Sequence, residues 1–226
     1  MDLNIMLSFA RKSSTSISLA DTELKNKALE NIAKALVDNA DKIIESNKAD
    51  LENAKQNGIS DAMLDRLTLN SDRICAISRS VEKLIKLEDP IGKGDKKVRN
   101  DGLEINKIRV PLGVVGIIYE ARPNVTVDTA CICIKSGNAA FLRGGKEAIN
   151  TNLCLCKIIQ DALESTGLDR NCVQVVPDTS RQSANDMMNA IGKIDVLIPR
   201  GGAGLIRACV ENSTVPVIET GTGNCH

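Results

Sequence analysis

Beyond Pro111 the chain alternates short, continuous apolar runs with segments of helical length, and this alternation limits most strongly which folds are open to it. The apolar runs span residues 113–118, 139–142, 173–176, 196–198 and 215–218. Strands of a parallel sheet have this composition because helices cover both faces of the sheet. The segments between the runs are predicted helices, at roughly 125–135, 146–165, 181–190 and 203–211. We therefore predict an α/β fold with a doubly wound, mostly parallel sheet that binds ligands at the carboxyl ends of its strands.

The first part of the chain has the pattern of amphipathic helices. From about residue 20 to residue 87, aliphatic residues recur at helical spacing among lysine, aspartate and glutamate. The turn-forming residues at 57–58 and 70–72 are typical of breaks between helices. We expect an N-terminal helical section at 1–95 whose charges form solvated faces, and we assign it no chemistry.

A β-hairpin is predicted between these two parts. The Asn-Asp-Gly sequence at 100–102 lies between β-prone flanks, and residues 89–95 have the composition of a linker. We place the hairpin at 96–110 and a Rossmann-like domain at 111–226. Since a ribbon between two domains more often packs or contacts another subunit than carries catalysis, the hairpin is a hypothesised oligomer contact.

The overall composition argues against several classes of partner. Lysine and arginine number 29, which equals the count of aspartate and glutamate, and the chain has one Tyr, two Phe and no Trp. It therefore lacks both a net field and a stacking surface for nucleic acid, and any bound anion must be held by local groups. No apolar stretch approaches the roughly 20 residues of a membrane span, and residues 1–19 do not resemble a secretory signal. We expect a cytoplasmic protein without a membrane partner.

The cysteines are predicted to be free thiols in the core. Six of the eight lie in apolar segments, at Cys131, Cys133, Cys154, Cys156, Cys172 and Cys209. The two Cys-x-Cys pairs lack a second pair of ligands at zinc spacing, so no metal is expected. Cys225 and His226 are adjacent, but neighbouring side chains on an extended segment point to opposite faces, and we reject them as a catalytic dyad.

Two cations follow the second apolar run. Arg143 and Lys146 flank a Gly-Gly pair where nicotinamide-binding sheets place the group that contacts the adenosine ribose. Cations there favour the extra phosphate of NADP over NAD. The alternative is a pair of solvated charges, but cations oppose the dipole at a helix start, which favours a bound anion.

Two further turns follow predicted strands. Residues 199–204 read Pro-Arg-Gly-Gly-Ala-Gly and open a helix, so the free N–H groups around Gly201 and Gly202 can face a phosphate. Such turns also occur without ligands, and this one is neither a Walker motif nor Gly-x-Gly-x-x-Gly. After the first strand, Arg122 could hold a carboxylate or phosphate, and the amide of Asn124 could stabilise an oxyanion or instead cap the next helix.

Taken together and in order, these motifs resemble the gamma-glutamyl phosphate reductase family (glutamate-5-semialdehyde dehydrogenases) of the aldehyde dehydrogenase superfamily. The matching strings are VPLGVVGIIYEARPN at 110–124, LRGGKEA at 142–148, IPRGG at 198–202 and ETGTGNCH at 219–226. The resemblance covers essentially the whole chain and implies an NADP(H)-binding domain at 111–226. It also implies reduction of gamma-glutamyl phosphate by NADPH to glutamate-5-semialdehyde and phosphate in proline biosynthesis.

The resemblance also implies roles for individual residues. Asn124 matches the oxyanion-hole amide, and Glu219 matches a carboxylate that serves as general base. Arg143 and Lys146 match the positions that hold the adenosine ribose and its 2′-phosphate, while Gly201 and Gly202 match the turn beside the pyrophosphate. Arg122 is the candidate substrate-binding residue. For the full-length protein the resemblance implies a homo-oligomer, with glutamate 5-kinase as a candidate partner.

The chain departs from the family pattern at the nucleophile. In the family a cysteine thiolate displaces the acyl phosphate from a segment further along, and Cys225 is not that residue. We expect this chain to be the cofactor-binding half, unable to form the acyl-enzyme alone. Three alternatives remain open: another aldehyde dehydrogenase relative with a different acyl substrate, a non-catalytic nucleotide-binding module, and a non-functional truncated product. The Arg-Pro-Asn sequence at 122–124 favours the acyl phosphate reductase.

Overall fold

A four-stranded parallel sheet forms the centre of the fold. The computed structural model describes residues 2–219 and 221 of the 226-residue chain. The strands are β3 (Val114–Tyr119), β4 (Ala139–Arg143), β5 (Val173–Val175) and β6 (Val196–Arg200), and they stand in the order β5-β4-β3-β6 with every pair parallel. Four predicted strands are thereby confirmed, as is the α/β class.

The prediction of a fifth strand at 215–218 is wrong. Only one isolated parallel bridge joins this segment to the sheet, between Val217 and Leu197 of β6. Leu197 donates its N–H to the carbonyl of Pro216, and Ile218 donates back to Leu197. Pro216 has no N–H of its own to add to a ladder, which is one reason that the pairing stays short.

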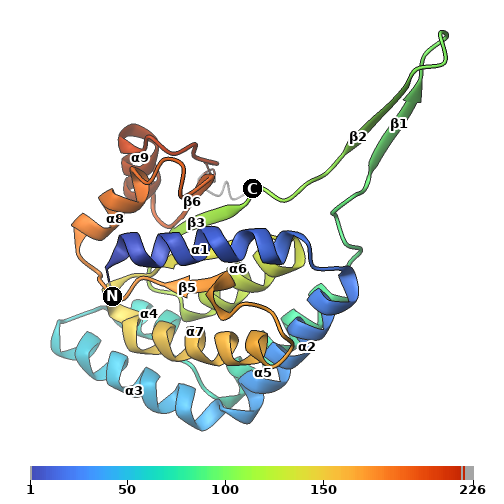
Figure 1. Cartoon of the computed structure of the whole chain (residues 1–226). Helices are drawn as coiled ribbons and strands as arrows, with labels where there is room; N and C mark the ends of the chain where they lie inside the picture. Colours follow the sequence, from blue (N-terminus) through green and yellow to red (C-terminus); the bar gives the residue numbers. More distant parts are fainter. Residues whose placement is uncertain (1, 220, 222–226) are drawn as a thin grey trace, which may run out of the picture.

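Helices cover both faces of the sheet (Figure 1). Alternate residues of β3 face opposite sides, since Val115 and Ile117 belong to one core cluster and Val114 and Ile118 to the other. The helices on the first side are α2 (Thr22–Asp38), α5 (Ser71–Ile85), α6 (Pro123–Lys135) and α7 (Ile149–Glu164). The helices on the second side are α1 (Leu3–Ser18), α8 (Arg181–Met188) and α9 (Ala203–Asn212).

Helix α1 is an element that the sequence pattern did not predict. Its buried residues Met6, Leu7 and Ala10 pack against the sheet in the second core cluster, while Ile17 near its end joins the first cluster with residues of α2. The predicted helical section does form after it, with breaks near residues 57 and 70. Its other helices are α3 (Ala40–Gln56) and α4 (Asp61–Leu67).

A buried carboxylate on α3 fixes the start of α7. Asp50 accepts hydrogen bonds from the Thr151 N–H (2.8 Å), the Thr151 hydroxyl (2.6 Å) and the Asn150 amide (2.8 Å). Helix α7 has no side-chain cap of its own, so Asp50 satisfies N–H groups that would otherwise be unpaired at its first turn. The short 3-10 turn at Lys146–Ala148 directly precedes α7, and this contact therefore also positions the turn after β4.

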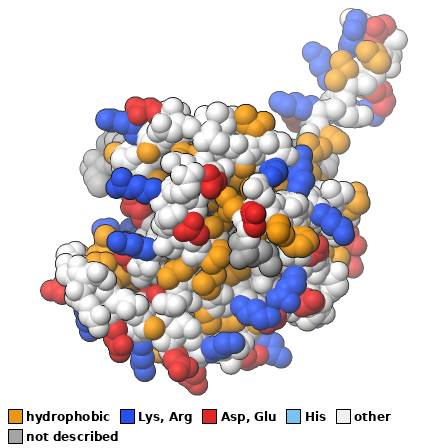
Figure 2. All heavy atoms as spheres, turned by 60° about the vertical axis from the view of Figure 1, so that its left-hand side comes forward, with side chains coloured by type: hydrophobic (Ala, Val, Ile, Leu, Met, Phe, Trp, Pro, Cys, Tyr) orange, Lys and Arg blue, Asp and Glu red, His pale blue; other side chains and the backbone are white. Residues whose placement is uncertain are grey.

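The predicted hairpin is confirmed and stands clear of the body (Figures 1 and 2). Strand β1 (Gly94–Val98) pairs antiparallel with β2 (Glu104–Ile108), and Gly102 supplies the positive φ of 83° in the turn. All residues of both strands are exposed, including Val98, Ile105 and Ile108. The ribbon therefore gains little stability from the core of this chain.

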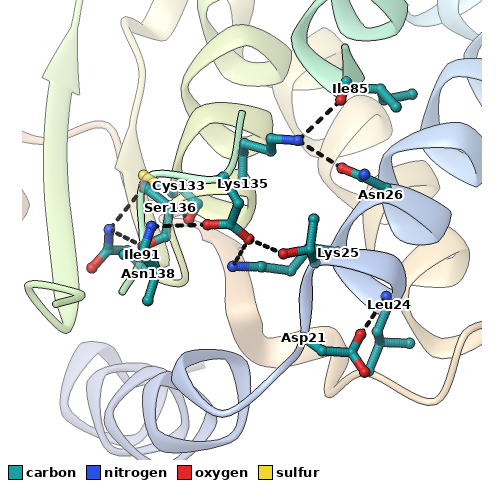
Figure 3. Close-up of polar contacts among 12 residues, drawn as sticks. Asp21, Leu24, Lys25, Asn26, Ile85, Ile91, Cys133, Lys135, Ser136 and Asn138 are labelled. Carbon is teal, nitrogen blue, oxygen red and sulfur yellow. Dashed lines mark hydrogen bonds and ion pairs between the residues drawn. The ribbon is translucent and has the colours of Figure 1, made fainter. Parts of the chain in front are cut away.

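The base of the hairpin is anchored by a buried ion pair (Figure 3). The ammonium of Lys25 on α2 lies 2.6 Å from the Asp89 carboxylate, which also accepts from the Thr22 hydroxyl and the Ile91 N–H. Close by, Lys135 donates to the Asn26 side chain and the Ile85 carbonyl. The Asp89 contacts tie the linker before β1 to α2, and the Lys135 contacts tie α6 to α2 and α5.

We expect Asp89→Asn to lower the free energy of unfolding at pH 7 by about 3 kcal/mol, because it leaves the Lys25 ammonium buried without a counter-charge. Burial alone raises the pKa of Asp89, but hydrogen bonds from Lys25, Ile91 and Thr22 outweigh it and hold that pKa below its ordinary value. The stabilisation is therefore fully present above the ordinary aspartate pKa and is lost as the pH falls through the lowered one.

Urea unfolding followed by circular dichroism at several pH values measures this effect. The difference in free energy of unfolding between wild type and Asp89→Asn should become smaller as the pH falls. Asp95→Asn, which changes an exposed carboxylate of the hairpin, is the control and should stay within about 0.5 kcal/mol of wild type. An Asp89→Asn variant as stable as the control would contradict the role of the ion pair.

Candidate functional site

The sheet brings two turns together at its carboxyl edge. Strand β3 pairs with β4 on one side and with β6 on the other, so the strand order reverses beside it. In open parallel sheets this reversal opens a crevice between the loops that follow the two strands. A cavity of about 840 Å³ lies there, lined by Met63, Arg66, Glu120, Ala121, Arg122, Val125, Glu147, Arg200, Gly201, Gly202 and Gly221. The predicted location of a ligand site is therefore a real hollow.

The turn after β6 holds an anion that belongs to the protein itself. The Gly202 N–H donates to a carboxylate oxygen of Glu120 at 3.1 Å, just before α9 begins at Ala203. A Cβ on Gly201 would lie 2.6 Å from the Glu120 carboxyl carbon, so a side chain there would displace this carboxylate. Helix α9 has no side-chain cap of its own. The turn therefore accepts a carboxylate of the protein, and its role toward a phosphate stays a prediction. The motif analysis assigned no role to Glu120.

Arg143 makes a contact that the sequence did not indicate. It ends β4, and its guanidinium donates to the carbonyls of Thr179 (2.6 Å) and Ser180 (3.0 Å) in the loop before α8. Burial lowers the pKa of Arg143, while the neighbouring charges of Asp178 and Glu147 oppose that shift. Its Nε is buried and has no hydrogen-bond partner among the residues that the structure describes.

Lys146 lies near Arg143 in sequence but differs in environment. It is exposed at the start of the 3-10 turn after β4. Both cations therefore follow β4 at the carboxyl edge, and neither lines the large cavity. Their role toward a cofactor phosphate stays a prediction.

The glycines between these cations are required by packing. A Cβ on Gly144 would lie 2.3 Å from the amide nitrogen of Asn152 and 3.1 Å from the ring of Tyr119. Behind it, a buried chain of hydrogen bonds runs from the Tyr119 hydroxyl to Thr126 (2.6 Å) and from Thr126 to Asn152 (2.8 Å). Gly144 thus allows β4 to pass close to this polar chain.

A second cavity of about 360 Å³ adjoins the first and shares two residues with it, Arg66 and Arg122. Asn124 lines it and donates to the carboxylate of Asp128, one helical turn away, at 3.0 Å. The alternative that Asn124 caps the helix is wrong, since α6 begins at Pro123 with Arg122 as its N-cap residue. One N–H of the amide remains for another acceptor.

Asp128 and Glu219 have contrasting environments. Burial raises the pKa of the half-buried Asp128 carboxyl, and the Asn124 hydrogen bond and the charge of Arg200 counteract it. Glu219 is exposed just beyond the Val217 bridge, and it lines neither cavity. Its predicted role as general base therefore has no geometric support among the residues that the structure describes.

Three arginines around the two cavities form no direct ion pair among the described residues. The side chains of Arg66, Arg122 and Arg200 make no ion pair or hydrogen bond within residues 2–219 and 221. Only Arg122 was assigned a role from the sequence. Arg66 lies in a helix of the N-terminal section, and no local motif links it to a turn that follows β3. Charged residues of both signs line the two cavities, but these three arginines are not engaged in ion pairs in the described part of the chain.

The thiols in the described part of the chain lie mostly away from solvent. Cys131, Cys133, Cys156, Cys172 and Cys209 are buried, as predicted, and Cys154 is half-buried. Burial raises the pKa of Cys133, Cys156 and Cys172 to about 12. Cys225 and His226 lie outside the described residues.

Neither a metal-binding cluster nor a membrane-spanning helix is found among the described residues. Residues 2–219 and 221 contain no cluster of three or more histidine, cysteine, aspartate or glutamate side chains that could hold a metal ion. Within the same range no helix combines the length and hydropathy of a membrane span.

Comparison with known proteins gives consistent matches. The model of the aldehyde dehydrogenase family matches residues 1–214. The gamma-glutamyl phosphate reductase of Clostridium acetobutylicum is 56% identical over 211 residues, which is 93% of this chain and 50% of that protein.

Solved structures give the same result. The gamma-glutamyl phosphate reductase of Thermotoga maritima superposes with a TM-score of 0.96 at 41% identity, covering 100% of this chain and 55% of that one. The Saccharomyces cerevisiae protein of the same name gives a TM-score of 0.88 at 33% identity, over 99% of this chain and 57% of that one. The chain spans about half the length of the curated relatives that it matches.

We expect Gly144→Ala to lower the free energy of unfolding by about 1–3 kcal/mol, because its Cβ would overlap the Asn152 amide and press on the Tyr119 ring. Gly204→Ala is the matched control. It lies inside α9 with open space around its Cβ position, and should be neutral or stabilise by up to about 1 kcal/mol. Chemical unfolding of both variants measures the difference, and equal stabilities would show that Gly144 is not required by packing.

Proposed function

The chain belongs to the aldehyde dehydrogenase family, and from this premise we propose that it is the cofactor-binding part of a gamma-glutamyl phosphate reductase. The proposed reaction is reduction of gamma-glutamyl phosphate by NADPH to glutamate-5-semialdehyde and phosphate, in proline biosynthesis. The likeness to reductases of that name along nearly the whole chain carries this proposal. The paired cavities at the carboxyl edge of the sheet are consistent with a cofactor and a substrate side by side.

The residues present fit a dinucleotide phosphate. The Gly201-Gly202 turn already accepts a carboxylate at the start of α9, and a pyrophosphate would take the same N–H groups. Beyond it, Arg143 and Lys146 would hold the adenosine ribose and its 2′-phosphate, and the unpartnered Nε of Arg143 is a donor in need of an acceptor. Glu147 lies at the same turn and opposes a phosphate by its charge, so cofactor preference has to be measured.

The chemistry assigned to this chain is binding and polarisation. A reduced nicotinamide supplies hydride when it is bound. The free N–H of Asn124 would stabilise the negative charge that develops on the acyl oxygen, with Asp128 holding the amide in that orientation. Arg122 would hold the acyl phosphate as phosphate leaves. The five buried cysteines are unsuited to act as the nucleophile, because burial raises their thiol pKa and shields them from substrate.

Fewer observations support the proposals on assembly and partners. The exposed apolar residues of the hairpin, among them Val98 and Ile108, support a homo-oligomer in which the ribbon contacts another subunit. An association with glutamate 5-kinase follows from the family likeness alone, as does the use of Glu219 as general base.

We expect calorimetric titration to show NADPH binding about tenfold more tightly than NADH, because only NADPH carries the 2′-phosphate. Lys146→Ala should weaken NADPH binding several-fold and leave NADH unchanged, and since Lys146 is exposed the fold should be unaffected. Arg207→Ala, which removes an exposed cation on α9, is the control. Equal affinities for both cofactors, or no binding of either, would defeat the assignment of Arg143 and Lys146.

We also expect Glu120→Gln to tighten NADPH binding by about fivefold. The carboxylate of Glu120 occupies the start of α9 and competes there with the cofactor phosphate. An anion at the start of a helix is stabilised by about 1 kcal/mol, so removal of the competing charge should favour the phosphate by a similar amount. The control Glu211→Gln lies near the opposite end of α9 and should change nothing. Weaker binding by Glu120→Gln would show instead that Glu120 contacts the cofactor directly.

A further inference from the structure

Helices α4 and α5, to which the sequence analysis assigned no chemistry, form much of the smaller cavity. Its walls come from α4, from α5 and from the start of α6, and enclose about 360 Å³. Apolar residues form part of the surface, at Leu69, Ala76 and Ile77, beside the hydroxyl groups of Thr68 and Ser80. It joins the larger cavity at Arg66 and Arg122. A small ligand here could thus meet both polar groups and a short apolar surface.

Some charged side chains in this cavity form an ion pair with each other, and the others form none with any residue that the structure describes. Arg73 is paired with Asp65 at 2.6 Å and also donates to the Thr68 carbonyl, so these two charges neutralise each other. Arg66 and Arg122 have no counter-charge among the described residues. The half-buried Asp128 accepts only the uncharged amide of Asn124. Within residues 2–219 and 221 the cavity therefore presents two cations without an ion pair and one carboxylate, Asp128, whose charge is offset only by the nearby charge of Arg200.

We propose that this cavity binds the amino-acid end of the substrate, an inference that rests on the function proposed above. An acyl phosphate of an amino acid carries one cation, the α-ammonium group, and two anions, the α-carboxylate and the phosphate. Arg66 pairs with the α-carboxylate, Asp128 pairs with the α-ammonium group, and Arg122 remains for the phosphate end. The side-chain methylenes lie against Leu69 and Ile77.

This arrangement makes Arg66 and Asp128 specificity-determining residues. A site built to pair charged groups rejects an analogue that lacks one of them, because a charge of the protein is then left without its partner. The polypeptide can be tested with three simple probes. L-glutamate has both α groups, glutarate lacks the ammonium group, and 4-aminobutyrate lacks the α-carboxylate.

The experiment is a titration of the isotope-labelled chain followed by amide NMR shifts of Leu69, Ile77 and Ser80, at constant ionic strength. We expect saturable shifts, with L-glutamate bound about tenfold more tightly than either analogue. Arg66→Ala should weaken L-glutamate binding by about tenfold and leave 4-aminobutyrate unchanged. Asp128→Asn should weaken L-glutamate binding and leave glutarate unchanged.

Arg79→Ala is the matched control, since Arg79 is an exposed arginine of α5 that lines neither cavity. Absence of saturable shifts, equal affinity for the three probes, or an Arg66→Ala variant that binds like the control would each overturn the inference. Titration of the same samples with NADPH separates the two proposals. NADPH binding without selective L-glutamate binding removes this inference and leaves the cofactor proposal, whereas loss of NADPH binding removes the cofactor proposal.

Discussion

The parallel pairing of β3 with both β4 and β6 is the constraint on which the rest of the site depends. Because β3 lies between them, the residues that follow it are enclosed by two glycine turns, one after β4 and one after β6. Glu120 therefore reaches the Gly202 N–H, while Asn124 and Asp128 open the next helix toward the smaller cavity. Glycine is needed at 144 because the Asn152 amide and the Tyr119 ring approach too closely for a Cβ, whereas a Cβ at 201 would displace the Glu120 carboxylate.

Local patterns explain which parts of this structure could be predicted from the sequence. The runs at 114–119 and 139–143 form strands because both faces are covered, and Asn-Asp-Gly at 100–102 forms its turn without outside help. The predicted strand at 215–218 forms only one bridge to the sheet, because Pro216 lacks the N–H that a longer ladder requires.

Contacts between distant segments could not be predicted in the same way. Nothing in the residues around Asp50 indicates that its carboxylate caps α7, a hundred positions later, or that α1 covers the second face of the sheet. The same holds for the site. Arg143 was found from its position after β4, but its bonds to Thr179 and Ser180 depend on a loop that the fold brings beside it. Arg66 reaches the cavities from a helix with no motif.

The internal carboxylate at α9 also limits how an anion is recognised there. The Gly202 N–H already binds the Glu120 carboxylate, so a phosphate that replaces this carboxylate gains at that N–H only the difference between the two anions. The displaced carboxylate returns to water, which further reduces the difference. Discrimination between related phosphates must therefore come from groups that have no internal partner. In the described part of the chain these groups include the Nε of Arg143 and the exposed Lys146 at the β4 turn, and the guanidinium groups of Arg66, Arg122 and Arg200 at the cavities.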